Sequence, residues 1–108
     1  MFRDDLKKRK ENTMYIFAVR AKVQPGKAEE FAQKWKNFYG SLARDLPGFQ
    51  QAYYAADRAT DTTLAVWIWS AKPDEAQLRQ AMQEFSAQIR NLTAGSPSPE
   101  WYEVLQHI

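Results

Sequence analysis

The sequence predicts an α+β fold in which four antiparallel strands form one sheet and two helices cover one of its faces. Two kinds of pattern predict it. Short segments rich in aromatic and branched residues have an apolar period of two, and two longer segments repeat apolar residues every three or four positions. These segments follow the order β-α-β-β-α-β. The chain has 108 residues, of which 44% are hydrophobic and 26% charged, and this composition suits one globular domain.

The first strand is predicted over residues 14–23. Every odd position from Tyr15 to Val23 is apolar, and this period of two is typical of a strand. On the other face, apolar side chains give way to Arg20 and Lys22. The strand is therefore expected to be buried on both faces at its start and on one face later.

Two amphipathic helices are predicted, each from one apolar stripe on a 3.6-residue period. The first covers residues 27–45, ends before the segment Leu46-Pro47-Gly48, and carries the stripe Phe31, Trp35, Phe38 and Leu42. The second covers residues 73–93, begins at a proline and ends before Gly95. Its stripe consists of Leu78, Met82, Phe85, Ile89 and Leu92.

The remaining strands are predicted over residues 49–56, 63–70 and 101–108. The first two are joined by the polar turn 57–62 and form an antiparallel hairpin. The strand over residues 63–70 is apolar on both faces, with Leu64, Val66 and Ile68 on one and Ala65, Trp67 and Trp69 on the other. Both of its faces must therefore be covered.

This order of elements is that of the ferredoxin-like split βαβ fold, whose two helices lie on one face of the sheet. The other face then needs a second cover, because a four-stranded apolar surface is too large for a soluble monomer to expose. We therefore expect a homodimer that pairs the two sheets. The predicted contact residues are Ile16, Ala18, Tyr53, Leu64, Val66 and Ile68.

Several classes of protein are excluded by residue type. The chain has no cysteine and one histidine, His107, so disulfides, thiolate metal sites and a histidine-rich metal cluster are not expected. The longest apolar run, Ala65 to Trp69, is five residues, far below the ~20 that a membrane helix needs. The first residues lack the apolar core of a secretory signal, so a cytoplasmic location without membrane contact is expected.

The positive charge is confined to the first residues. Residues 1–13 hold five basic and three acidic residues, whereas residues 14–108 hold ten of each. We therefore divide the chain into a charged leader, 1–13, and a domain, 14–108. A neutral domain without the aromatic, basic motif of an RNA-recognition strand predicts no nucleic-acid binding. The basic run of the leader is interpreted as a solvated segment.

Four segments resemble one known family. They are VQPGKAEEF from Val23 to Phe31, LPGF from Leu46 to Phe49, VWIWS from Val66 to Ser70, and WYEVL from Trp101 to Leu105. Together they resemble the antibiotic biosynthesis monooxygenase family of the dimeric α/β-barrel superfamily, over residues 14–108. That superfamily includes cofactor-free oxygenases of phenols and quinols, haem-degrading oxygenases, isomerases and members without known activity.

The resemblance implies a cofactor-independent, monooxygenase-like protein that acts on a small aromatic or quinol compound, with no cofactor and no metal. The sequence matches the family pattern at Tyr54 and Trp69. It departs from that pattern at Ala65, where aromatic oxygenases have Asn, and in a second helix without His. Haem degradation is disfavoured, since Val19 replaces the Asn of that branch. The alternative is a non-catalytic binding or structural member, and no catalytic residue is assigned.

The expected binding site lies between the sheet and the helices, because the opposite face is taken by the dimer contact. Tyr54, Trp67 and Trp69 are predicted to line it, with Phe17, Val19 and Phe85 as its apolar walls. The alternative for the two indoles is that they fill the core between sheet and helices. Tyr54 either hydrogen-bonds a substrate hydroxyl or lies at the rim of the fold.

Overall fold

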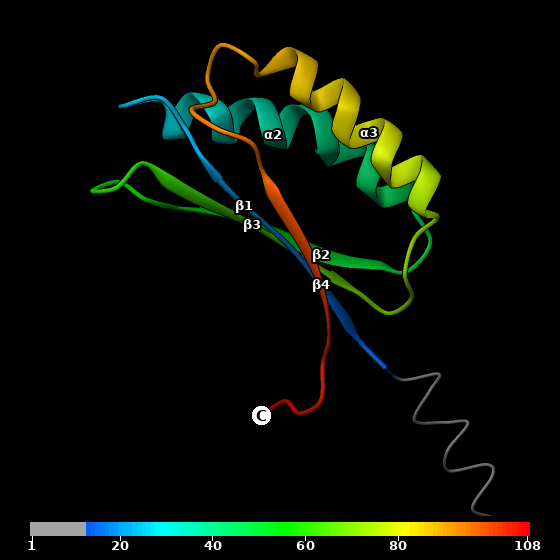
Figure 1. Cartoon of the computed structure of the whole chain (residues 1–108). Helices are drawn as coiled ribbons and strands as arrows, with labels where there is room; N and C mark the ends of the chain where they lie inside the picture. Colours follow the sequence, from blue (N-terminus) through cyan, green and yellow to red (C-terminus); the bar gives the residue numbers. More distant parts are fainter. Residues whose placement is uncertain (1–12) are drawn as a thin grey trace, which may run out of the picture.

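The computed structural model describes residues 13–108, and it has one four-stranded antiparallel sheet with both helices on one face (Figure 1). The strand order is β2-β3-β1-β4, so the predicted ferredoxin-like α+β fold is confirmed. The predicted leader lies, apart from Thr13, outside the described residues. The elements are β1 (Tyr15–Lys22), α2 (Ala28–Leu42), a 3-10 turn (Ala43–Asp45), β2 (Phe49–Asp57), β3 (Thr62–Trp69), α3 (Glu75–Gln88) and β4 (Ser98–Glu103).

Two glycines allow the chain to turn between these elements. The Lys27 N–H donates to the Gln24 carbonyl at 3.0 Å, and Gly26 has φ 73°, which is the geometry of a type II turn. Gly48 has φ 86°, and a Cβ there would lie 2.6 Å from the Ala71 carbonyl oxygen. Only glycine therefore fits the entry into β2, where the Gly48 carbonyl accepts a hydrogen bond from the Ser70 N–H at 2.7 Å.

Helix α3 is shorter than predicted. It ends at Gln88, five residues before the expected Thr93, although the stripe residue Leu92 is buried. The reason is tertiary hydrogen bonding. The Leu92 carbonyl accepts from the Gln24 N–H at 2.7 Å, and Ala94 donates to the Lys22 carbonyl at 3.0 Å. These hydrogen bonds to the end of β1 and to Gln24 hold the segment after Gln88 in a non-helical conformation.

Strand β4 begins earlier and ends earlier than predicted, at Ser98 and Glu103 rather than at residues 101 and 108. The proline-rich segment 96–99 contributes Ser98 and Pro99 to the strand. Pro99 pairs opposite Val19. Proline lacks an N–H, and β4 tolerates it because an edge strand needs hydrogen bonds on one side only.

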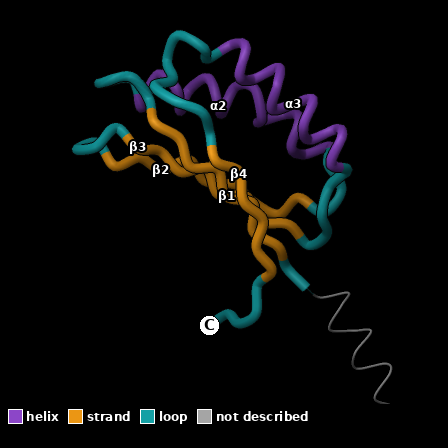
Figure 2. The backbone as a smooth tube through the Cα atoms, in the orientation of Figure 1, coloured by secondary structure: helices purple, strands orange, loops and turns teal. Residues whose placement is uncertain are grey.

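The core lies between the sheet and the helices. In β3 the odd residues from Thr63 to Trp69 are buried, and the even residues face the other side and are half-buried. Figure 2 shows that no element of the described chain covers that other side of the sheet. Tyr53 on this face is 57% exposed. The outer face is thus apolar and uncovered, and the pairing expected to cover it remains a prediction.

Neither helix of the described part is long and apolar enough to cross a membrane.

Candidate functional site

A cavity of about 680 Å³ lies between the sheet and the two helices. Its floor comes from β1 and β3, including Phe17, Val19 and Trp67. Helix α2 supplies Phe31 and Trp35, and α3 and β4 complete the wall. The lining is predominantly aromatic and aliphatic, with few polar groups, as is usual for a site that binds a small organic molecule.

Five of the six predicted site residues line this cavity: Tyr54, Trp67, Phe17, Val19 and Phe85. The alternation of side chains between the two faces of the sheet brings them together. Residues 17 and 19 of β1, 54 of β2 and 67 of β3 all point to the helix-covered face, because Phe17 pairs with Trp67 and Val19 and Tyr54 both pair with Ala65. Phe85 reaches the same space from α3.

Trp69 is not among the lining residues. It has no exposed surface, its ring stacks on Trp67 at 5.9 Å and 10°, and it meets Phe49 edge-on at 5.7 Å. Parity correctly places it on the face of the helices. However, the end of β3 is filled by packed rings, and the cavity reaches along the strand only from Thr63 to Trp67. Trp69 therefore belongs to the core, as the alternative interpretation expected.

Helix α2 contributes more to the cavity than the sequence indicated. Phe31, Trp35 and Tyr39 line it at spacings of four residues. The Tyr39 ring lies 4.8 Å from that of Trp67, and Trp35 lies 5.5 Å from Trp67. The apolar stripe of the first helix contained the signal for Phe31 and Trp35, and Tyr39 follows one turn later on the same side.

Tyr54 packs against two of the α2 rings. Phe31 stacks on it at 5.3 Å and 15°, and Trp35 lies at 5.4 Å. Its hydroxyl is buried and has no hydrogen-bond partner within residues 13–108. The neighbouring Thr63 hydroxyl donates to the Ala21 carbonyl at 3.2 Å. The Tyr54 hydroxyl lies close to this Thr63 hydroxyl, but no hydrogen bond of ordinary geometry joins the two, so the phenol is free to pair with a ligand.

Burial raises the pKa of Tyr54 to about 12, although the neighbouring Thr63 hydroxyl lowers it in part. Burial also raises the pKa of Tyr39 well above its usual range. The charged form of a phenol is disfavoured where water is excluded. Both tyrosines are therefore neutral at physiological pH, and the Tyr54 hydroxyl is available there as a hydrogen-bond donor rather than as a base.

The structure contains no obvious metal-binding group in the part it describes. Within residues 13–108 no three or more His, Cys, Asp or Glu side chains lie close enough together to hold a metal ion. The single histidine, His107, is exposed near the end of the chain and does not line the cavity.

Comparison with known proteins adds to this geometry. A model of the family described as antibiotic biosynthesis monooxygenase matches residues 14–70. No curated protein matches the chain at a significant level.

Several solved structures have the same fold. One is a candidate antibiotic biosynthesis monooxygenase from Bordetella bronchiseptica, with a TM-score of 0.71 and 18% identity over 86% of this chain and 98% of that chain. A monooxygenase from the gene ActVA-Orf6 of Streptomyces coelicolor, in complex with nanaomycin D, has a TM-score of 0.67 and 16% identity, covering 90% and 92%. A mutant of SnoaB, a cofactor-independent oxygenase from Streptomyces nogalater, has a TM-score of 0.64 and 18% identity, covering 88% and 96%.

Proposed function

Because the chain belongs to the antibiotic biosynthesis monooxygenase family, we propose that it binds a small, flat aromatic or quinol compound in this cavity and oxidises it with O₂ without a cofactor. The observation that carries the proposal is the buried Tyr54 hydroxyl, which has no partner in the described residues and lies among aromatic rings that line a cavity. Rings bind flat aromatic molecules by stacking and edge contacts. An unpaired donor favours a ligand that brings an oxygen acceptor to it.

The proposed reaction relies on the chemistry of the substrate. A phenol or anthrone that loses a proton to solvent becomes an electron-rich anion that can transfer an electron to O₂. A hydrogen bond from the Tyr54 hydroxyl to the anionic oxygen stabilises this anion. Aromatic walls hold the ring in one orientation and exclude water from it.

For an anthrone, the atoms balance without an external reductant. O₂ adds to the ring methylene carbon to give a hydroperoxide, and the proton lost earlier returns to the peroxide oxygen. The O–O bond and the second C–H bond then break, leaving a C=O group and releasing water. One oxygen atom remains in the product, the other leaves in the water molecule with both methylene hydrogens, and the substrate supplies all the electrons.

The second candidate function is non-catalytic binding of the same class of compound. Ala65 favours it, because the family's aromatic oxygenases have Asn at this position and Ala65 lines the cavity. Helix α3 also lacks the His that is frequent in quinol-oxidising relatives. In this case the protein would hold the ligand without accelerating its oxidation.

We also propose that the protein works as a homodimer. The supporting observation is the uncovered outer face of the sheet, where the predicted contact residues on β1, β2 and β3 are half-buried or exposed. This pairing would leave the cavity on the helix side of each protomer open to ligand.

Oxygen consumption with a panel of hydroquinones and anthrones tests the proposal, with ligand binding followed by tryptophan fluorescence. Tyr54→Phe is expected to lower turnover about 10- to 100-fold, because it removes one hydrogen bond to a charged oxygen. Tyr53→Phe is the matched control, since this neighbouring tyrosine is on the outer face and donates to Gln51 at 2.8 Å. Binding without turnover would support the second candidate, and absence of binding would contradict both.

A further inference from the structure

The charged side chains that line the cavity come from α3 or from the two residues directly after it, 89 and 90. They are Glu75, Arg79 and Arg90. Glu75 and Arg79 are one helical turn apart, so their charges partly offset each other. Arg90 lies about four turns from Glu75 along the chain, and no carboxylate lines the cavity near it. The positive charge of the lining is thus concentrated at the Arg90 end.

Nothing in the described structure uses the Arg90 guanidinium. The two salt bridges found within residues 13–108 join Lys27 to Glu30 and Arg58 to Glu29. A basic side chain after a helix can instead serve the last free carbonyls, but two carbonyls at this end already have donors. The Ile89 carbonyl accepts from the Leu92 and Thr93 N–H groups at 2.9 and 3.2 Å, and the Arg90 carbonyl accepts from the Thr93 hydroxyl at 3.2 Å.

Strand register shows what else lies at this end of the cavity. Val23, just after β1, forms a bridge with Thr93. Two residues earlier, Ala21 pairs with Thr63 on β3. Tyr54 is on β2 opposite the next inward-facing residue of β3. The unpaired Tyr54 hydroxyl is therefore on the same side of the cavity as the end of α3.

The opposite end of the cavity is aromatic. Phe17 pairs with Trp67 on one side and with Trp101 on the other, and the Phe17 and Trp101 rings are 4.6 Å apart. The cavity thus has an aromatic end, where the charges of Glu75 and Arg79 partly offset each other, and an end lined by Tyr54 and by the solvent-exposed Arg90. A molecule complementary to both has a flat ring system and an anionic acceptor at one edge, and a carboxylate suits this edge because a guanidinium forms paired hydrogen bonds with its two oxygens.

We propose that the ligand of this cavity is an aromatic acid whose rings lie against Phe17 and Trp67 and whose carboxylate binds Arg90. This inference rests on the proposed function, because it takes the same cavity as the binding site. It adds a specificity: between two otherwise equal aromatic compounds, the protein prefers the one with a carboxylate.

The test uses anthraquinone-2-carboxylate and its uncharged methyl ester, with dissociation constants measured by calorimetry on the full chain. The acid is expected to bind about tenfold more tightly than the ester, the scale of one charge-assisted hydrogen bond. Arg90→Gln should remove this preference while leaving the affinity for the ester unchanged. Retained ester binding also shows that the variant is folded.

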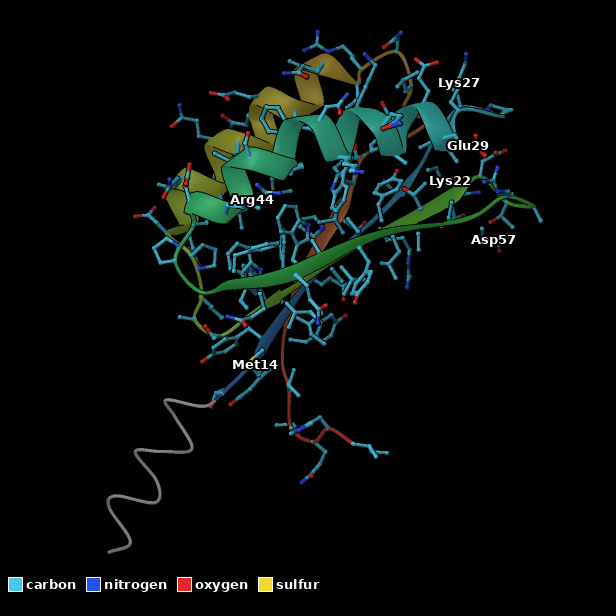
Figure 3. All side chains as sticks on the ribbon, turned by 180° about the vertical axis from the view of Figure 1, so that it is seen from behind. Met14, Lys22, Lys27, Glu29, Arg44 and Asp57 are labelled. Atoms are coloured by element: carbon cyan, nitrogen blue, oxygen red, sulfur yellow. The ribbon has the colours of Figure 1, made fainter. Side chains whose placement is uncertain are left out.

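Two matched variants complete the design. Arg44→Gln removes the same charge from the 3-10 turn, at the end of α2 opposite Lys27 (Figure 3), where it does not line the cavity. It should keep the full preference, and Arg79→Gln should keep most of it. Equal binding of acid and ester, or a preference that survives Arg90→Gln, would overturn this inference alone. If neither compound binds, the proposed function fails with it.

Discussion

Two buried polar atoms of this fold, the Tyr54 hydroxyl and the Trp69 indole nitrogen, have no hydrogen-bond partner within the described residues. An unpaired buried group costs about 1–3 kcal/mol, so each must be offset. For Trp69 the offset is packing, because the indole is fully buried among other rings. Tyr54 lines the cavity, so a ligand can supply its missing partner. Packing thus offsets the missing hydrogen bond at Trp69, and the proposed ligand would offset it at Tyr54.

Alkaline pH is expected to destabilise the protein through Tyr54. Its pKa is about 12 in the folded chain, against about 10 in an unfolded chain. Between these values the unfolded state loses a proton that the folded state keeps, so rising pH favours unfolding. The contribution of protonated Tyr54 to the free energy of unfolding is fully present below about pH 10 and is lost as the pH rises through about 12. Burial of Tyr39 acts in the same direction.

Urea unfolding measured from pH 8 to 12 checks this. Tyr54→Phe should weaken the fall of the free energy of unfolding with pH, whereas Tyr53→Phe removes an exposed phenol as a control. An identical slope in the wild-type protein and Tyr54→Phe would show that burial of this phenol is not maintained in solution.

At the scale of elements, the ends of helices and strands depend on backbone geometry as much as on side-chain pattern. Gly48 connects the 3-10 turn to β2 with a positive φ, in contact with the backbone of Ala71. Gly40 is within α2, where an added Cβ would meet nothing within 4 Å. Replacing the two glycines is therefore expected to have opposite effects on stability.

Replacing each of these glycines by alanine tests that contrast. Gly48→Ala should lower the free energy of unfolding by about 2 kcal/mol or more, because the side chain meets a backbone oxygen and the φ is unfavourable. Gly40→Ala should raise it by about 0.5–1 kcal/mol, because alanine is the better helix former. Denaturant unfolding of both variants measures the difference. Equal effects would mean that the Gly48 backbone relaxes at little cost.

In the molecule as a whole, both helices lie on one face of the sheet, and the opposite face is uncovered in the described residues. Val66 is at the centre of that face, where it pairs with Ala18 of β1 and with Tyr53 of β2. No element of residues 13–108 covers this face of the sheet (Figure 2). The apolar area would be costly to expose to water, and this cost is the physical argument for the proposed homodimer.

Light scattering at micromolar concentration tests the assembly. The wild-type protein should have twice the 12.6 kDa mass of one chain, and Val66→Asp should give monomers or unfolded chains, because it would bury an unpaired charge. Gln33→Glu adds the same charge on the exposed surface of α2 and should leave the dimer intact. A wild-type protein of 12.6 kDa would contradict the proposed dimer.

Sequence patterns alone predict the fold and part of the candidate site. Period-two and 3.6-residue patterns are local properties of the chain, and they reflect which side of each element is buried. They therefore predicted the element order and the face of β3 that packs against the helices, and five of the six site residues predicted from them line the cavity.

Only the tertiary structure decided where those patterns stop and where space remains. Hydrogen bonds from Gln24 and to Lys22, distant along the chain, end α3 before its apolar stripe does. Packing of rings at the end of β3 places Trp69 in the core. The rings of Phe31 and Trp35 enclose Tyr54, whose hydroxyl has no partner within the described residues. Cavities and unpaired atoms depend on how several elements pack together. The hydrophobic period of a single helix or strand therefore cannot predict them.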